Sequence, residues 1–274
     1  MVSNCKSSLA GVDRSTRVLT CVRTTEKFAL LIESPFNPRV KAATALHQKK
    51  HRDASGLFLI EGAAFVARAA AAGFEVVELW HAGTQPPAIA AAEVFETTEA
   101  VLSKITGKSN PQAVLGVVRQ RTIPLPATLT NLWLALDRPR DPGNLGTIIR
   151  TADACAVEGL ILIGDAADPF APECIRATSG SIASVPLARC TEADFLAWAN
   201  GRELIGTAGD ATLDYRQANA RKNAVILMGN ESDGLTEVLR AACTRLVCIP
   251  MWGKAESLNL AIATGVMLYE VRRI

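Results

Sequence analysis

From Leu132 onward, short apolar runs alternate with segments that have helical spacing. The runs are LWLAL at 132–136, LILIG at 160–164, ELIGTA at 203–208, AVILMG at 224–229 and RLVCIP at 245–250. Helices are expected between them over 145–157, 191–199 and 234–242, with a last helix over 257–273. Apolar strands joined by helical crossovers are typical of a parallel sheet that is buried on both faces. The pattern therefore predicts an α/β domain over 131–274, with a mostly parallel sheet and helices on both faces.

A second, smaller α/β unit is predicted over residues 26–121. Strands are expected over 28–33, 57–60, 75–80 and 112–119, and helices over 37–50, 62–72 and 98–105. Residues 122–130, TIPLPATLT, are uncharged and rich in Pro and Thr, which favours a linker between two domains. A length of 274 residues agrees with about two domains.

The composition excludes several classes of protein. Apolar residues make up 49% and charged residues 20% of the chain, which argues against disorder over most of its length. No uncharged run reaches the about 20 apolar residues of a membrane helix, so we expect a soluble protein without a membrane partner. The net charge of +2 is too small for a histone-like polycation. A nucleic-acid partner therefore requires locally concentrated positive charge.

The cysteines and the N-terminus indicate the cellular compartment. The seven cysteines are scattered and include no CxxC pair, which favours reduced thiols in a cytoplasmic protein over a disulfide framework or a zinc site. We therefore expect no bound metal. Residues 1–25 lack the apolar region of a secretory signal and are rich in Ser, Thr and Arg. A flexible extension, or a start assigned too early, is favoured there over a transit peptide.

Three predicted strand ends are rich in Gly, Asn, Glu and Ser. They are DRPRDPGNLGTIIRTADA at 137–154, MGNESDGL at 228–235 and IPMWGKAESLNLAIATGVMLYE at 249–270. In open parallel sheets, ligands bind beyond the carboxyl ends of the strands. Each segment taken alone also has an ordinary structural explanation. These explanations are a helix cap at Asn144 with a solvated Arg150, turn chemistry around Glu231, and an amphipathic last helix capped by Ser257.

That last helix is expected to have an apolar stripe, formed by Leu258, Ala261, Ile262, Gly265, Leu268 and Tyr269. Motifs of competing functions are absent from the sequence. GxGxxG, GxxxxGK[ST], GxSxG and HExxH do not occur, which argues against a nicotinamide oxidoreductase, a P-loop protein, a serine hydrolase and a zinc protease. His47, His51 and His81 all precede the larger domain, and we expect surface or RNA-facing positions for them rather than catalytic roles.

Together and in order, the three segments resemble the motifs of the SpoU/TrmH family of RNA ribose 2′-O-methyltransferases, within the SPOUT superfamily. The resemblance covers about 132–273, and any one motif alone would be weak. It rests on Asn144-x-Gly146 with Arg150-Thr151-Ala152, on Gly229-Asn230-Glu231 through Gly234, and on Ile249-Pro250-Met251, Ser257-Leu258-Asn259 and Leu268-Tyr269-Glu270. More loosely, residues 34–120 resemble the α/β substrate-binding domain, similar to ribosomal proteins that bind kinked RNA, which often precedes this catalytic domain.

The resemblance implies a deep trefoil knot, a homodimer with the active site near its interface, and S-adenosylmethionine as the methyl donor. Knots are rare exceptions to ordinary chain topology, and periodicity alone does not predict one. The resemblance also implies that the knotted loops bind the cofactor, mainly through backbone groups. The implied cofactor-binding residues are Thr207, Ala208, Gly209, Gly229, Ile249, Met251 and Leu258.

The resemblance implies that Arg150 acts at the reacting ribose. Because a guanidinium is a poor base at neutral pH, Arg150 can instead neutralise the neighbouring phosphate and orient the 2′-hydroxyl, while a phosphate oxygen or water takes the proton. Asn144 is expected to support Arg150 or the ribose, and Glu231 to orient Arg150, within one chain or across the dimer. Ser257 and Asn259 are expected to fix the ribose and the cofactor loop. The protein then has to align the reactants and remove one proton.

A basic cluster between residues 38 and 52 independently favours an RNA partner. The cluster has no acidic residue and contains Arg39, Lys41, Lys49, Lys50 and Arg52. Such a cluster can contact phosphates without reading sequence, although a solvated helix face is the ordinary alternative. The added N-terminal domain favours ribosomal RNA over transfer RNA, by analogy alone. A transfer-RNA methyltransferase and a catalytically silent RNA-binding assembly factor remain the alternatives.

Overall fold

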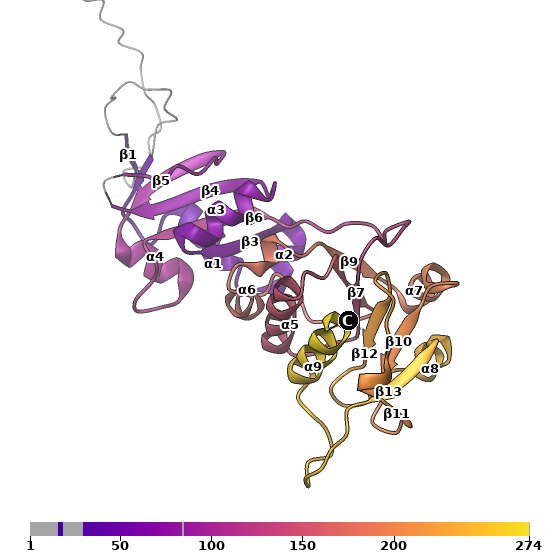
Figure 1. Ribbon diagram of the computed structural model, residues 1–274. Coiled ribbons are helices and arrows are strands. Elements are labelled where there is room, and N and C mark those ends of the chain that lie inside the picture. The colour runs from indigo at the N-terminus through magenta and orange to yellow at the C-terminus, as the bar shows by residue number, and fades with distance from the viewer. Residues whose placement is uncertain (1–15, 19–29, 84, 274) are drawn as a thin grey trace, which may run out of the picture.

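The computed structural model describes residues 16–18, 30–83 and 85–273 and contains two β-sheets, one in each lobe of the molecule (Figure 1). The prediction of an extension over 1–25 therefore lies outside the described residues, except that Thr16–Val18 form strand β1. Among the described helices, none combines the length and the apolar character that crossing a membrane requires.

The N-terminal sheet is mixed, and its strand order is β1-β2-β5-β4-β6-β3. Strands β2, β4 and β5 pair in parallel, whereas β6 runs antiparallel to both β3 and β4. After β1, the strands are β2 (Leu30–Ile32), β3 (Leu57–Glu61), β4 (Val76–Ala82), β5 (Glu93–Thr97) and β6 (Val114–Arg119). The helices are α1 (Pro38–Ala45), α2 (Lys49–Ser55), α3 (Ala63–Ala71) and α4 (Glu99–Thr106).

The prediction of one helix over 37–50 is wrong, because α1 and α2 are separate helices. Asn37 caps α1 by accepting a hydrogen bond from the Arg39 amide. At the other end, the Arg52 guanidinium donates to the carbonyl oxygens of Leu46 and His47, at 2.8 and 2.9 Å. These carbonyls lie in the turn where a continuous helix would have used them, so a side chain from α2 stabilises the break. Strand β5 lies between β2 and β4 and was not predicted.

The C-terminal sheet was predicted to be mostly parallel and is parallel at every described pairing, with the strand order β11-β13-β10-β12-β7-β8-β9. Its strands are β7 (Trp133–Asp137), β8 (Gly159–Ile163), β9 (Leu187–Cys190), β10 (Leu204–Thr207), β11 (Leu213–Asp214), β12 (Val225–Met228) and β13 (Arg245–Cys248). Strands β9 and β11 were not predicted. The order reverses beside β7, because the chain builds β8 and β9 on one side and then crosses to β10 on the other.

Helices cover both faces of this sheet, also as predicted. Leu134 and Leu136 of β7 face α5 (Pro142–Ala154) and α9 (Leu260–Arg272), whereas Trp133 and Ala135 face α7 (Glu192–Ala199) and α8 (Glu237–Ala242). Because both faces are apolar, the strand reads as a continuous hydrophobic run in the sequence. A further helix, α6 (Pro172–Thr178), packs against α5 and was not predicted.

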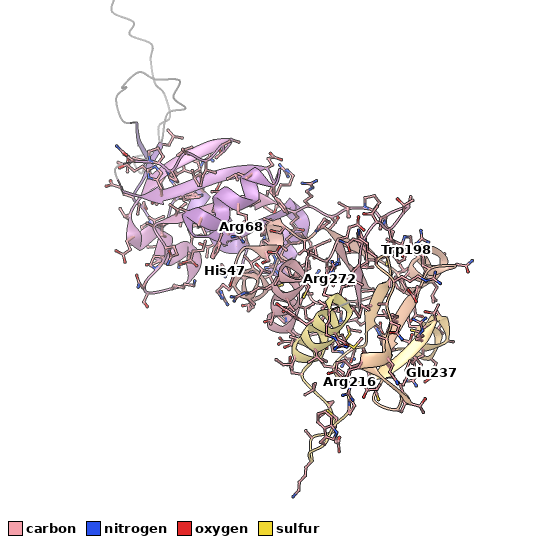
Figure 2. All side chains as sticks on the ribbon, in the orientation of Figure 1. His47, Arg68, Trp198, Arg216, Glu237 and Arg272 are labelled. Atoms are coloured by element: carbon pink, nitrogen blue, oxygen red, sulfur yellow. The ribbon has the colours of Figure 1, made fainter. Side chains whose placement is uncertain are left out.

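The last helix begins later than expected. It starts at Leu260 because the Asn259 side chain accepts hydrogen bonds from the amides of Ala261 and Ile262, so that Asn259, and not Ser257, is the cap. The predicted apolar stripe is also partly wrong, since Ile262 and Tyr269 are 56% and 61% exposed. At its far end, Arg272 donates to the carbonyl of Cys155 and to the Asn131 side chain, which ties α9 to the end of α5 (Figure 2).

The two lobes share one hydrophobic core. Phe58 of β3 packs on Phe170 with ring centroids 4.9 Å apart, and both rings are buried in a cluster that extends into both sheets. Residues 122–130 connect the lobes and are themselves packed, because Ile123 pairs with β9 and the Trp198 indole donates to the Pro126 carbonyl. The predicted linker is therefore a fixed connection along the larger sheet.

Candidate active site

The carboxyl ends of β13, β10, β12 and β7 lie next to one another, since these strands are neighbours in that order. A cavity of about 630 Å³ lies there, between the loops after β10, β12 and β13 and the start of α9. The sequence-predicted cofactor residues all line this cavity: Thr207, Ala208, Gly209, Gly229, Ile249, Met251 and Leu258. Glu231, Ser257 and Asn259 line it as well. The role of these residues toward a ligand stays a prediction.

The loop after β12 depends on a glycine at position 229. A Cβ atom there would lie 2.4 Å from the Gly234 carbonyl carbon, which is far inside van der Waals contact. The loop turns back on itself through paired backbone hydrogen bonds between Asn230 and Gly234, and the Asn230 side chain accepts from the amides of Ser232 and Asp233. The buried Asn230 thus shapes the turn. Gly229 allows the backbone before the turn to lie against the backbone after it, at Gly234.

Residues from the three sequence motifs form one chain of hydrogen bonds. Asn259 Nδ2 donates to Asn144 Oδ1 at 2.9 Å, and Asn144 Nδ2 donates to Glu231 Oε1 at 3.3 Å. Asn144 is positioned because it lies in the first turn of α5, where Asp141 accepts a hydrogen bond from its amide and serves as the cap. The ordinary alternative, in which Asn144 is itself the cap, is therefore wrong.

Arg150 lies two turns further along α5 and has a different partner from the one expected. Its Nη1 donates to Ser179 Oγ at 3.3 Å. Glu231 instead accepts from Asn144 and from the Arg140 amide, so neither Glu231 nor Asn144 orients Arg150 within the single chain. The reason is spacing: Arg150 lies six residues after Asn144 and so leaves the helix on another side, facing α6.

Ser179 is a site residue that sequence reasoning missed. It follows α6 with a φ of +49°, a left-handed conformation that costs a non-glycine residue about 1–3 kcal/mol. Gly180 is left-handed too, with φ +89°. The pair Ser-Gly after a short helical segment was the available signal, but α6 itself was not predicted. This strained turn places the serine hydroxyl beside Arg150.

Asp137 is a second missed residue. It ends β7, is 1% exposed, and accepts hydrogen bonds from the Arg138 guanidinium at 2.8 and 3.0 Å. It also accepts from the Thr236 amide, at the cap of α8. Hydrogen bonding to Asp137 raises the pKa of Arg138. The Asp137 carboxylate therefore joins the end of β7 to the start of α8.

The predicted RNA-binding cluster is only partly available to a ligand. Lys41 and Lys50 are exposed, and Lys49 is exposed but pairs with Asp53 at 2.6 Å. Arg39 donates to both carboxylate oxygens of Glu93, and this hydrogen bonding raises the pKa of the arginine.

Arg52 does not belong to an RNA-contacting surface, and its prediction is wrong. It is 3% exposed and its guanidinium contacts Asp168 of the other lobe at 2.8 Å. A charge run in sequence does not reveal a carboxylate 116 residues away, which is why Arg52 was grouped with its neighbours. Its role is to join the lobes.

Comparison with known proteins gives two family matches. The SpoU rRNA methylase family matches residues 131–269, and the MRM3-like substrate binding domain matches residues 37–116. A 23S rRNA (guanosine(2553)-2′-O)-methyltransferase of Bacillus subtilis is 32% identical over 88% of this chain and 98% of its own. A 23S rRNA (uridine(2479)-2′-O)-methyltransferase of Streptomyces viridochromogenes is 33% identical over 83% of this chain and 86% of its own.

A solved structure is also similar over most of the chain. It is the AdoMet-bound rRNA methyltransferase from Sinorhizobium meliloti, with 42% identity, a TM-score of 0.83, and coverage of 89% of this chain and 97% of that one. The fold and these matches define an RNA methylase with an N-terminal domain similar to a known substrate-binding domain. The chain belongs to the SpoU rRNA methylase family.

Proposed function

We propose that this protein transfers a methyl group from S-adenosylmethionine to a ribose 2′-hydroxyl of large-subunit ribosomal RNA. The observation that carries the proposal is the cavity at the strand ends, which is lined by residues of the second and third motifs and is joined to the first motif through the hydrogen bonds of Asn144. The relatives from Bacillus and Streptomyces are named for this reaction on 23S rRNA, and together they support ribosomal over transfer RNA.

The cavity fits the cofactor in size and in chemistry. Its volume of about 630 Å³ lies within the range of about 300–1,000 Å³ that is usual for small-molecule sites. Its lining combines three glycines with apolar side chains and a few polar ones, so the adenosine and amino-acid parts would be held at Thr207–Gly209, Ile249–Met251 and Leu258. When bound, S-adenosylmethionine supplies an already activated methyl group. No metal is needed to activate it, and we propose none.

The chain's own residues position the acceptor. Arg150 is exposed and carries a positive charge on α5, where it can neutralise the phosphate next to the target ribose and orient the 2′-hydroxyl. Ser179 holds the guanidinium from one side. Asn144, Glu231 and Asn259 hold the cavity edge through their hydrogen bonds, with Ser257 beside them. A phosphate oxygen or water accepts the proton, since a guanidinium is a poor base.

We further propose that the chain is knotted, dimeric and cytoplasmic. The knot is proposed from membership of the SpoU rRNA methylase family, because the resemblance implies it. In support of a homodimer, Ile262 and Tyr269 lie seven residues apart on α9 and are exposed. The loop before α9 carries Trp252, which is 87% exposed, and a second copy would cover such an apolar surface. A cytoplasmic location follows from the proposed ribosomal substrate.

Labelled S-adenosylmethionine tests the reaction directly. The protein is incubated with unmodified large-subunit rRNA and, in parallel, with transfer RNA. We expect label in rRNA alone, at one nucleotide that resists alkaline cleavage. Label in transfer RNA alone would move the substrate to that class. Cofactor binding without transfer to either RNA would indicate that the substrate is an assembly intermediate, whereas neither transfer nor cofactor binding would favour the silent assembly factor.

A further inference from the structure

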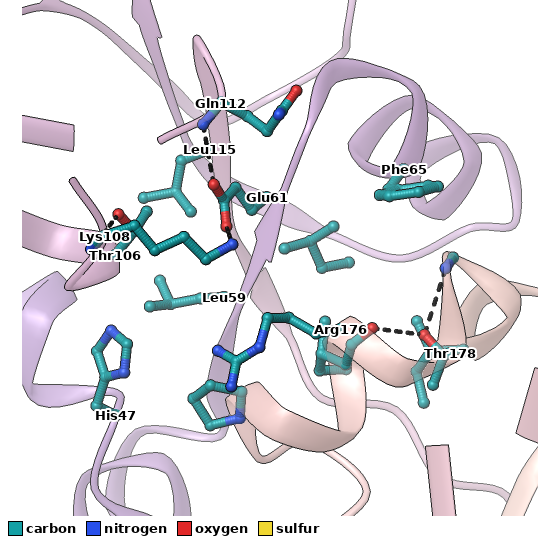
Figure 3. A pocket seen from close by; sticks show the side chains of 15 residues that line it. His47, Leu59, Glu61, Phe65, Thr106, Lys108, Gln112, Leu115, Arg176 and Thr178 are labelled. Atoms are coloured by element: carbon teal, nitrogen blue, oxygen red, sulfur yellow. Dashed lines mark hydrogen bonds and ion pairs between the residues drawn. The ribbon is translucent and has the colours of Figure 1, made fainter. Parts of the chain in front are cut away.

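A second cavity lies between the two lobes, at the junction marked by His47 and Arg68 in Figure 2. It has a volume of about 350 Å³ and is lined from one lobe by β3, α3 and the loop after α4, and from the other by α6 and the turn after it. No residue of the cofactor cavity lines it. Figure 3 shows its side chains from close by.

The floor of this interlobe cavity is apolar, and its rim carries charged and polar side chains. Leu59, Leu115 and Ile175 form buried floor positions, and Phe65, 38% exposed, stands at one end. In Figure 3 the side chain of Arg176 extends across the cavity toward His47, with Lys108 and its partner Glu61 above. An apolar floor, an aromatic ring and a guanidinium are the groups with which proteins hold an unstacked RNA base.

Two polar groups at the rim are available to a ligand. Arg176 has a 3.7 Å ion pair with Glu173 and, within the described chain, donates no hydrogen bond from its guanidinium. His47 Nε2 lies 2.7 Å from the Ile105 carbonyl oxygen. Because a carbonyl only accepts, Nε2 carries the hydrogen and a neutral ring leaves Nδ1 as an acceptor. A donor and an acceptor thus lie on opposite sides of one cavity.

The cavity adjoins the residue proposed to contact the reacting ribose. Thr178 and Gly180 line it, and Ser179 between them accepts the hydrogen bond from Arg150. The turn at 178–180 therefore contacts both sites. The Ser179 hydroxyl lies beside Arg150, whereas Thr178 and Gly180 line the cavity. An RNA strand bound at Arg150 would therefore lie next to this cavity.

We propose that the interlobe cavity holds the unstacked base of a nucleotide that flanks the methylated one, with Arg176 and His47 contacting the edge of that base. This subsite rests on the proposed RNA methyltransferase function and adds a specificity element to it. Phe65 and the apolar floor hold the face of the base. The subsite selects RNA in which a base next to the target can leave its stack.

Steady-state methylation with two variants tests the subsite. Arg176→Ala and His47→Ala change partly exposed side chains, so folding should persist. We expect each to raise the KM for RNA about 5- to 100-fold, the range of a lost base contact, with kcat and cofactor affinity unchanged. The matched control is Arg221→Ala, which removes an exposed arginine from the loop before β12, at the strand ends opposite the cofactor cavity. Variants within about twofold of wild type would overturn the proposal.

RNA with an abasic nucleotide identifies the occupant. With the abasic nucleotide at one position flanking the target, the wild type should show the same rise in KM that Arg176→Ala shows with intact RNA. Arg176→Ala assayed with that abasic RNA should show no further rise in KM. Full additivity at every flanking position would overturn the proposal.

A readout without turnover separates this subsite from the proposed function. RNA containing 4-thiouridine, irradiated with the full-length wild type, should crosslink to peptides spanning 59–65 or 172–182. Crosslinks only elsewhere would refute the subsite. Crosslinks there without any methyl transfer would refute the proposed function and leave the subsite as an RNA-binding site.

Discussion

The buried ion pair between the lobes should be a principal determinant of stability. Arg52 donates to Asp168 and to two carbonyl oxygens, and both side chains are less than a tenth exposed. Removing one member of such a pair leaves an uncompensated buried charge, at a cost of about 3–5 kcal/mol in the free energy of unfolding. Arg52→Met should lie at the upper end of that range, because among the described residues the Asp168 carboxylate then retains only the amide of Phe170 as a donor.

The opposite variant should be milder. In Asp168→Asn, the Arg52 guanidinium keeps its two carbonyl acceptors, at 2.8 and 2.9 Å. We therefore expect a smaller loss than for Arg52→Met. In the double variant the losses should not add, with a coupling of about 1–3 kcal/mol.

Urea unfolding, followed by circular dichroism and by tryptophan fluorescence, measures these differences. Lys49→Met is the matched control, since Lys49 lies in the same basic run but forms an exposed pair with Asp53, worth about 0.3–0.5 kcal/mol. Arg52→Met within about 1 kcal/mol of the wild type would refute the assignment of Arg52 to a buried clamp. A loss equal in Lys49→Met and Arg52→Met would refute the distinction between them.

Three other changes probe the active site and the interior. Arg150→Ala should lower kcat at least about 100-fold in the labelled-methyl assay and leave cofactor affinity unchanged, and retained turnover would contradict its proposed role. Gly229→Ala should abolish cofactor binding by calorimetry, because its Cβ would lie 2.4 Å from the Gly234 carbonyl carbon, whereas Gly253→Ala meets no atom within 4 Å and should bind normally. Burial raises the pKa of the Cys243 thiol to about 11, so at pH 8 only about a thousandth is thiolate. Alkylation of Cys243, mapped by mass spectrometry, should therefore accelerate about tenfold per pH unit up to that value, and a rate that levels off near pH 9 would contradict the burial.

The larger domain was predictable because its signals are local. Strands such as β7 and β8 are buried on both faces, so each appears as an unbroken apolar run, and the motifs follow the strands directly. The chain of hydrogen bonds through Asn144 could be expected only from the family resemblance. Its members come from three segments that the strand order brings together, and no single segment predicts that order.

The failures depend on contacts between distant residues. Arg52 was predicted to bind phosphate because its partner Asp168 is distant in the sequence. Ile262 fitted an apolar stripe by spacing, yet it is exposed because the core-facing side of α9 follows Ala261 and Leu268. The pair Ser179-Gly180 signals a turn but does not reveal its neighbours, and the place of Ser179 beside Arg150 arises only when α6 packs on α5.

The shared core has a consequence for how RNA is selected. Phe58 and Phe170 bury each other from opposite lobes, and the connecting residues 122–130 are packed, so the described chain has no hinge between its proposed RNA-binding and catalytic parts. The distance between these parts is then set once, during folding. Under the proposed function, the RNA must supply the deformation that brings its ribose to Arg150. We therefore expect discrimination among RNAs by how readily each one bends, because the packed junction holds the two lobes in one arrangement.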